Sequence, residues 1–198
     1  MSEALAPSAR RLGAAVRAFF AWEPPDAAKQ ALAALAGELR ERPHGDAVRW
    51  VRPEGYHVTL RFLGNVPAAD VPALARAVEG ALAGCASFPL ALGATRAFPS
   101  ARQPRVVVIE LEPEADLAAL AARVEAGVVA AGLPAEKRRF RAHLTLGRVR
   151  GRRVPALDAK PPAAGALDVR EVVLFRSDLG RDGSRYTPLA QLPLTSSL

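Results

Sequence analysis

The sequence is poor in the residues that build disulfide scaffolds and cysteine-based metal sites. Its 198 residues include one cysteine, Cys85, one methionine and two tryptophans. A single cysteine cannot form an internal disulfide or supply a cysteine-based zinc site, and it favours a reducing, cytoplasmic location. The fold therefore has to rest on an apolar core, which a chain of this length with 50% apolar residues can build.

Long apolar runs are also missing. No stretch reaches the roughly 18 apolar residues of a membrane span, because Arg17 interrupts the longest N-terminal candidate. The segment 10–16 faintly resembles a secretory signal, but its apolar part is too short and no cleavage-like site follows. We expect no membrane association, a flexible N-terminal tail over residues 1–14 and a single folded domain over 15–198.

Common catalytic signatures are absent from the sequence. It has no H-E-x-x-H motif, no P-loop, no dinucleotide-binding glycine pattern and no G-x-S-x-G motif. Zinc hydrolases, nucleoside triphosphatases, dehydrogenases and serine hydrolases therefore lack support. A metal site made of His44, His57 and His143 is conceivable but would leave neighbouring threonines unexplained. We expect neither a metal nor another cofactor.

The charge is unbalanced towards arginine. Lys and Arg number 27 against 20 Asp and Glu, which gives a net charge of +7, and only three of the 27 are lysine. Arginine suits bidentate recognition of phosphate, although a compositional bias towards Ala, Arg, Gly and Pro explains the excess equally well. Residues 137–153 hold eight basic residues and no acidic one. This window predicts an electropositive patch for a polyanion.

Apolar periodicity predicts an alternation of strands and helices. Helices are expected where Leu and Val recur at spacings of three and four, and strands where apolar or β-branched residues run or alternate. The expected helices span 27–42, with Asp26 as N-cap, 69–83 and 114–131. The expected strands span 16–22, 48–51, 56–63, 88–92, 106–111, 140–149, 169–175 and 186–192.

The order of these elements predicts the fold class. Strands 48–51 and 56–63 are expected to pair around the turn 52–55, and the last two strands around the turn 180–183. Hairpin-like pairs between helices favour an α+β fold with antiparallel sheets over a doubly wound parallel fold. The Pro- and Ala-rich segment 155–165 is expected to be a surface loop.

One tetrapeptide pattern occurs twice and uses two of the three histidines. The copies are His57-Val58-Thr59-Leu60 and His143-Leu144-Thr145-Leu146, 86 residues apart. On a strand, the His and Thr side chains of each copy lie on one face and the aliphatic side chains on the other. Each copy thus presents an imidazole beside a hydroxyl, a pairing that a purely structural histidine would not need twice.

Two such copies facing each other across a cleft suit displacement at phosphorus. One imidazole can take a proton from the attacking group while the other, protonated, gives one to the leaving oxygen. The hydroxyls can hydrogen-bond the non-bridging phosphate oxygens. Histidine fits both roles because its pKa near 6.5 leaves both forms populated close to neutral pH.

The chain resembles the two-histidine phosphoesterase superfamily, and within it the bacterial and archaeal RNA 2′,3′-cyclic phosphodiesterases, also called 2′-5′ RNA ligases. The resemblance runs from about Arg17 to Leu192. The segments that carry it are 17–21, 50–64, 97–100, 104–106, 143–148 and 177–179, with Gly183 and Tyr186. One departure is Ala142, which stands where family members usually have proline before the second histidine.

The resemblance implies two related α+β lobes whose antiparallel sheets face a central, positively charged cleft, with helices on the outer faces. It implies that His57 is the general acid that protonates the departing ribose 3′ oxygen and His143 the general base that activates water. Thr59 and Thr145 would hold the phosphate oxygens. The substrate would be RNA or an oligonucleotide ending in a 2′,3′-cyclic phosphate, the product a 2′-phosphate, and the reverse reaction a weak 2′-5′ ligation.

Three further residues are candidates for substrate binding. The resemblance implies a phosphate contact for Arg148, but strict alternation places it on the opposite face from His143 and Thr145, unless a bulge occurs at Gly147. Phe62 and Tyr186 could stack on a base of single-stranded RNA or could simply belong to the core.

Other functions stay open at this level. The substrate could be a small nucleotide or ADP-ribose cyclic phosphate, or the chain could be a non-catalytic RNA-binding module, although binding alone does not need a paired proton donor and acceptor. We take a monomer as the default state.

Overall fold

The computed structural model describes residues 14–165, 167–180 and 183–196 of the chain. Its helices are α1 (Asp26–Glu41), α2 (Val71–Leu82) and α3 (Glu114–Ala130), with single 3₁₀ turns at Gly45–Ala47, Pro53–Gly55 and Ala68–Asp70. Its strands are β1 (Ala15–Trp22), β2 (Val48–Trp50), β3 (Val58–Pro67), β4 (Phe88–Phe98), β5 (Val106–Glu112), β6 (His143–Val149), β7 (Leu167–Val169), β8 (Glu171–Gly180) and β9 (Gly183–Pro193). Within these residues, no helix is both long and apolar enough to cross a membrane.

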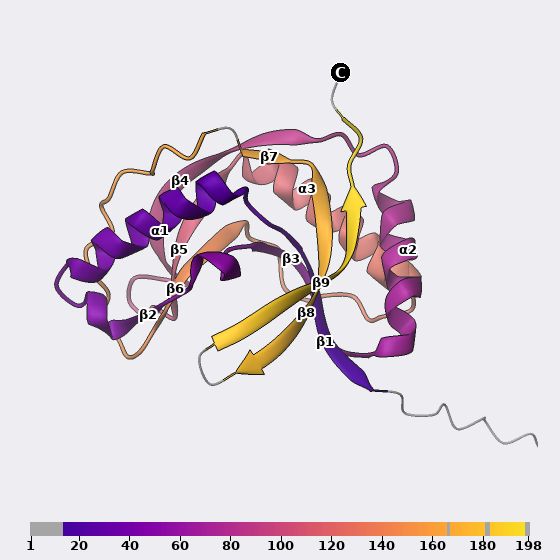
Figure 1. The fold of residues 1–198 in the computed structure, drawn as a ribbon, viewed down its shortest axis with the longest axis horizontal. Coiled ribbons are helices and arrows are strands. Elements are labelled where there is room, and N and C mark those ends of the chain that lie inside the picture. The colour runs from indigo at the N-terminus through magenta and orange to yellow at the C-terminus, as the bar shows by residue number, and fades with distance from the viewer. Residues whose placement is uncertain (1–13, 166, 181–182, 197–198) are drawn as a thin grey trace, which may run out of the picture.

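The strands form two antiparallel sheets. The first sheet has the order β3-β1-β8-β9 and the second the order β2-β6-β5-β4-β7. In Figure 1 the β8–β9 hairpin, in orange and yellow, projects on one side while β4, β5 and β6 lie behind α1. The expected α+β fold with two antiparallel sheets is confirmed.

The two halves of the chain repeat one unit. In the first half β1 is followed by α1, the short strand β2 and then β3, which pairs antiparallel with β1. In the second half β5 is followed by α3 and then by β6, which pairs antiparallel with β5. The two tetrapeptides thus lie at corresponding places, where the chain enters β3 and where it enters β6.

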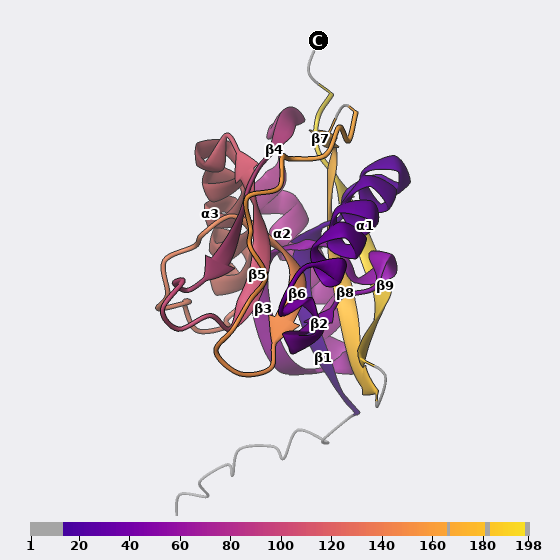
Figure 2. The same cartoon turned by 90° about the vertical axis from the view of Figure 1, so that its left-hand side faces the viewer.

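The helices connect the two units. Helix α1 contacts β2 and β6 of the second sheet, whereas α3 packs against α2 and contacts β3 of the first sheet. Figure 2 shows α1 on one side of the sheets and α2 with α3 on the other. One apolar cluster consequently includes residues of both sheets, among them Phe20, Leu60, Ile109 and Leu144.

Strand β1 is apolar on both faces because both of its faces are covered. Phe20 and Trp22 belong to the main core, whereas Phe19 and Ala21 pack with Val173 and Phe175 in a second, smaller cluster on the other face. A strand buried on both sides reads as a continuous apolar run rather than an alternating one. The smaller cluster lies beside the first motif, because the ring of Phe19 packs against the ring of His57.

The predicted pairing of strands 48–51 and 56–63 is wrong. The residues between them form the 3₁₀ turn Pro53–Gly55, and β2 pairs instead with β6, placing Val48 opposite Val149 and Trp50 opposite Gly147. A side chain at Gly147 would meet Val48 Cγ1 at 2.4 Å, so glycine allows the close approach of β2. Strand β3 pairs with β1, its partner across α1.

Two smaller boundary predictions are also wrong. The expected strand 169–175 is two strands. Val169 is the last residue of β7, which pairs with β4 in the second sheet, and Arg170 separates β7 from β8, the strand that contains Phe175. Asp26 is the first residue of α1 rather than its cap, since Pro25 occupies that position without a side-chain hydrogen bond. Asp26 instead forms an ion pair one turn along the helix, with 3.5 Å between its Oδ1 and Nζ of Lys29.

Candidate active site

A cavity of about 1270 Å³ brings the two motifs together. His57 and Thr59 line it from the first sheet, and His143 and Thr145 line it from the second. Arg148 and Tyr186 line the same cavity. Six of the seven residues expected at the site therefore border one space, although the motifs are 86 residues apart in the chain.

Both imidazoles are fixed in the same way. Nδ1 of His57 lies 2.8 Å from the carbonyl oxygen of Gly55, and Nδ1 of His143 lies 2.8 Å from the carbonyl oxygen of Arg141. A carbonyl can only accept, so in each ring Nδ1–H donates to the backbone two residues earlier. This arrangement leaves Nε2 of each histidine as the atom that can exchange a proton with a ligand.

Aromatic side chains hold the planes of both rings. The centroid of the His57 ring lies 4.9 Å from the centroid of the Phe19 ring and 4.9 Å from that of the Tyr186 ring, which it meets edge to face. The His143 ring stacks on Phe98 at 5.0 Å with an angle of 14° between the planes. Each imidazole is thus restrained by a hydrogen bond and by ring packing, so that little ordering remains for the moment of reaction.

A bulge follows the threonine in each motif. Along β6, Val108 pairs with Thr145 and its neighbour Val107 with Gly147, so Leu146 is an extra residue in the strand. Along β3, Ala21 pairs with Thr59 and Phe20 with Arg61, so Leu60 is the extra residue. After such an insertion the alternation of side chains shifts by one position.

The bulge explains how Arg148 reaches the site. Leu146 and Gly147 are both buried, and Arg148 is exposed to the cavity that His143 and Thr145 border. The insertion lies at Leu146, one residue before the glycine at which the sequence suggested it. Strict alternation failed here because one extra residue returns the next side chain to the original face.

Phe62 occupies the position in β3 that corresponds to Arg148 in β6, but it lies outside the residues that border the cavity. Its side chain is 39% exposed, and the guanidinium of Arg17 lies 4.5 Å above its ring. Tyr186, in contrast, borders the cavity and packs edge to face against both His57 and Phe19. Stacking of a base on either ring stays a prediction.

Sequence reasoning missed most of the positive charge of the cavity. Besides Arg148, the arginines that line it are Arg49, Arg52, Arg105, Arg176 and Arg185, against the acidic residues Glu54 and Asp178. Of the eight Lys and Arg residues in the window 137–153, only Arg148 lines the cavity. Arg105 stands in one of the segments that carry the family resemblance, a signal that could have marked it.

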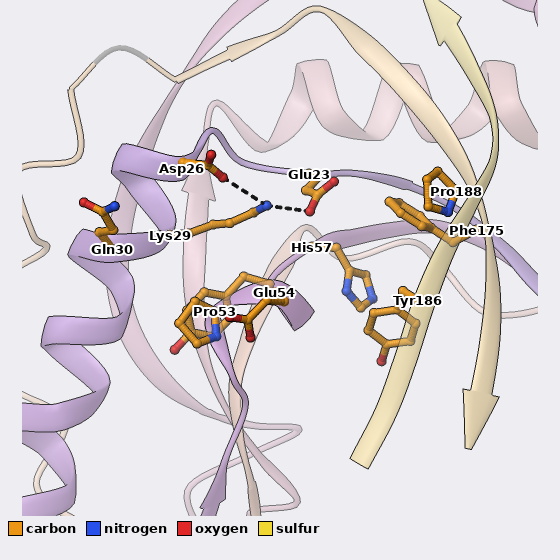
Figure 3. A pocket seen from close by; sticks show the side chains of 11 residues that line it. Glu23, Asp26, Lys29, Gln30, Pro53, Glu54, His57, Phe175, Tyr186 and Pro188 are labelled. Atoms are coloured by element: carbon orange, nitrogen blue, oxygen red, sulfur yellow. Dashed lines mark hydrogen bonds and ion pairs between the residues drawn. The ribbon is translucent and has the colours of Figure 1, made fainter. Parts of the chain in front are cut away.

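A second cavity of about 540 Å³ adjoins the first at His57 and Tyr186 (Figure 3). Lys29 lies within it, 2.5 Å from Glu23. The phenol of Tyr56 also borders this cavity, and burial raises its pKa to about 12, so it stays protonated at neutral pH. Figure 3 shows the ion pair of Lys29 on one side of the His57 ring and Tyr186 on the other.

The surroundings of His57 disfavour its charged form in the ligand-free protein. Burial is the main cause that lowers the pKa of His57, and the nearby side chains of Arg148 and His143 lower it further. The hydrogen bond to Gly55 and the carboxylate of Glu23 act in the opposite direction. An anion bound between His57 and Arg148 would reverse part of this effect, since it favours the protonated imidazole.

Among the described residues, no three His, Cys, Asp or Glu side chains gather as ligands of a metal ion would. The cavity is bordered by two imidazoles, several hydroxyls and six guanidiniums, besides two carboxylates, and these groups can move protons and hold an anion. Such a set can bind a phosphate and carry out acid and base catalysis on it.

The family model described as LigT like phosphoesterase matches the chain twice, over residues 23–108 and 109–186. Each match contains one His-x-Thr motif, in agreement with the repeated unit of the fold. Together these matches cover most of the chain. The protein belongs to the LigT-like phosphoesterase family, and the resemblance noted in the sequence is confirmed.

Relatives with curated names support this assignment. The RNA 2′,3′-cyclic phosphodiesterase of Geobacillus stearothermophilus is 31% identical over 171 residues, which are 84% of this chain and 54% of that protein. The protein of the same name from Methanothermobacter thermautotrophicus is 30% identical over 181 residues, 88% of this chain and 96% of that protein. This chain thus spans about half of the first relative and nearly all of the second.

Solved structures agree with the fold. The crystal structure of Escherichia coli LigT complexed with 3′-AMP superposes with a TM-score of 0.75 at 28% sequence identity. The match covers 92% of this chain and 99% of that protein. The architecture is therefore shared along almost the full length of both chains.

Proposed function

We propose that this protein hydrolyses the 2′,3′-cyclic phosphate at the end of an RNA to a 2′-phosphomonoester, as a monomer and without a metal ion. His57 and His143 are the catalytic residues, and the reverse reaction gives weak 2′-5′ ligation. Both motifs belong to one chain and border one cavity, which supports the monomer.

The reaction follows from the two Nε2 atoms. Neutral His143 takes a proton from a water molecule through Nε2 as the water oxygen attacks phosphorus. The bond between phosphorus and the 3′ oxygen breaks, and protonated His57 gives the Nε2 proton to that oxygen. One proton is taken and one is given, so the enzyme returns to its starting charge state once the two imidazoles re-equilibrate with solvent.

The neighbouring side chains hold the phosphate during this step. The hydroxyls of Thr59 and Thr145 donate to its non-bridging oxygens, and the guanidinium of Arg148 compensates the negative charge that grows on them. Hydroxyls from both sheets fix the phosphorus between the two imidazoles, as an in-line displacement requires.

The acid role of His57 requires a bound anion. In the free protein burial lowers the pKa of His57, so its protonated fraction at neutral pH is small. The phosphate of the substrate favours the charged imidazole and thus the form that donates the proton. Acid catalysis is thereby coupled to substrate binding.

The observation that carries this proposal is the matched anchoring of the two imidazoles at one cavity. Each donates Nδ1–H to a backbone carbonyl at 2.8 Å, and each belongs to a motif with a threonine at the same cavity. The curated relatives named RNA 2′,3′-cyclic phosphodiesterase support the substrate class.

The test is turnover of an oligonucleotide with a 2′,3′-cyclic phosphate end in the presence of EDTA. We expect hydrolysis at an unchanged rate, and loss of hydrolysis in His57→Ala and His143→Ala. Activity that disappears with EDTA and returns with zinc or manganese would exclude the two-histidine mechanism. Binding of the oligonucleotide without turnover would favour a non-catalytic RNA-binding module.

A further inference from the structure

Three arginines lie next to one another at one edge of the cavity. In the pairing of β2 with β6, Arg49 stands directly opposite Arg148. On the other side of β6, Val106 stands opposite Arg148, and Arg105 precedes Val106 in the chain. The backbone N–H of Val149 donates to the carbonyl of Arg105 at 2.9 Å, which fixes the start of β5 beside the end of β6.

Among the described residues, none of these three arginines forms an ion pair with a carboxylate. Ion pairs instead join carboxylates to Arg42, Arg61, Arg96, Arg170 and Arg176. Like charges directly opposite on neighbouring strands are destabilising. The proximity of Arg49, Arg105 and Arg148, here called the arginine row, is therefore unfavourable in the free protein and becomes favourable when anions lie between the guanidiniums.

The row extends beyond the place of the reacting phosphate. Arg148 borders the cavity together with both histidines, whereas Arg49 on β2 and Arg105 just before β5 flank it on either side of β6. The cavity of about 1270 Å³ also exceeds the range of about 300–1,000 Å³ that is usual for small-molecule sites. The two further arginines indicate a ligand with a second phosphate, and the volume of the cavity leaves room for it.

We propose that Arg49 and Arg105 form a binding subsite for the phosphate on the 5′ oxygen of the terminal nucleotide. This inference rests on the proposed function and narrows its substrate to the ends of RNA chains, as opposed to free nucleoside 2′,3′-cyclic phosphates. Guanidiniums suit this role because they bind phosphate in a bidentate manner, and a contact to phosphate does not depend on the identity of the base.

The experiment compares three substrates at fixed ionic strength. They are adenosine 2′,3′-cyclic phosphate, the same nucleotide with a 5′-phosphate, and the dinucleotide ApA with a 2′,3′-cyclic phosphate end. We expect kcat/KM to be about tenfold or more higher for the second and third, since a hydrogen bond to a charged group contributes at least that factor. In Arg49→Gln and Arg105→Gln, the ratio of kcat/KM for either phosphate-bearing substrate to kcat/KM for adenosine 2′,3′-cyclic phosphate falls towards one.

Arg123→Gln is the matched control. Arg123 is exposed on α3, outside the cavity, so its loss changes the net charge equally but leaves the ratio as in the wild type. For a longer oligonucleotide, the logarithm of the association constant falls less steeply with the logarithm of the salt concentration, its slope becoming less negative by about 0.7 for each lost contact. Arg49→Gln also melts no lower than the wild type, because it removes a like-charge contact with Arg148.

Equal kcat/KM for the three substrates in the wild type would overturn the subsite, as would a ratio unchanged in both arginine variants. No turnover of any of the three would instead contradict the proposed function itself. The two failures are therefore distinguishable.

Discussion

Gly147 is the position at which packing, strand pairing and the site depend on one another. A methyl group at this residue would lie 2.4 Å from Val48 Cγ1, 3.2 Å from Trp50 Cε3 and 3.3 Å from the carbonyl oxygen of Arg49. Val48 is only 4% exposed and belongs to the core, so it cannot move aside. Gly147→Ala therefore has to displace β2 from β6, and overpacking of this kind costs about 1–3 kcal/mol.

The assay is thermal unfolding together with hydrolysis of an RNA cyclic phosphate. For a protein of this size each kcal/mol corresponds to about 2–4 °C, so the Tm of Gly147→Ala falls by at least about 2 °C. Hydrolysis also slows, because Arg49 and Arg148 lose their register across β2 and β6. The control is Gly37→Ala in α1, where no heavy atom lies within 4 Å and a helix interior gains about 0.5–1 kcal/mol. A Gly147→Ala protein that melts at or above the wild type would refute the close approach of β2.

Three further predictions concern the histidines and Arg61. In steady-state kinetics, His57→Ala and His143→Ala each lower kcat by at least about 10²-fold, and the double variant is little worse than either, because both histidines act on one transition state. The control is His44→Asn, at an exposed position with left-handed backbone outside both cavities, which leaves kcat unchanged. The profile of kcat/KM against pH is bell-shaped, because one imidazole must be protonated and the other neutral, and its limbs belong to the coupled pair. Because burial lowers the pKa of His57, one limb has its midpoint below about 6.5, and Arg148→Gln moves that limb upward, whereas a downward move would contradict this account of His57. Arg61→Met removes the ion pair with Glu125 and the hydrogen bond at 2.6 Å to the carbonyl of Pro134, so the free energy of unfolding measured in urea falls by about 1–3 kcal/mol. An unchanged urea midpoint would be evidence against this link between β3 and the segment before β6.

The sequence predicts the secondary-structure elements and the two His-x-Thr motifs that we propose as catalytic, because both have local signals. Apolar periodicity marks each helix and most strands, and the repeated His-x-Thr pattern marks the faces that carry the imidazoles and hydroxyls. Pairing partners are not local, however. Val48–Trp50 pairs with β6, about 100 residues further along, since the space beside Gly147 admits its backbone.

The face on which a residue lies was predictable only up to the first irregularity. The extra residues Leu60 and Leu146 look like any other apolar residue of a strand, so nothing in the pattern reveals that the alternation shifts after them. The shift places Arg148 at the cavity. The arginine row across β2, β6 and the start of β5 has the same origin, because Arg49 and Arg105 become neighbours of Arg148 only through pairing over long sequence distances.

The central claim is that His57 gives its proton to the 3′ oxygen while His143 activates water on the other side of the phosphorus. Phosphorus NMR of the products from an oligonucleotide with a 2′,3′-cyclic phosphate end tests it most directly, because it distinguishes a 2′-phosphate from a 3′-phosphate. The account predicts the 2′-phosphate as the dominant product, formed in the presence of EDTA. A dominant 3′-phosphate would contradict it, since the leaving oxygen would then be the 2′ oxygen and the assigned positions of acid and base would be reversed.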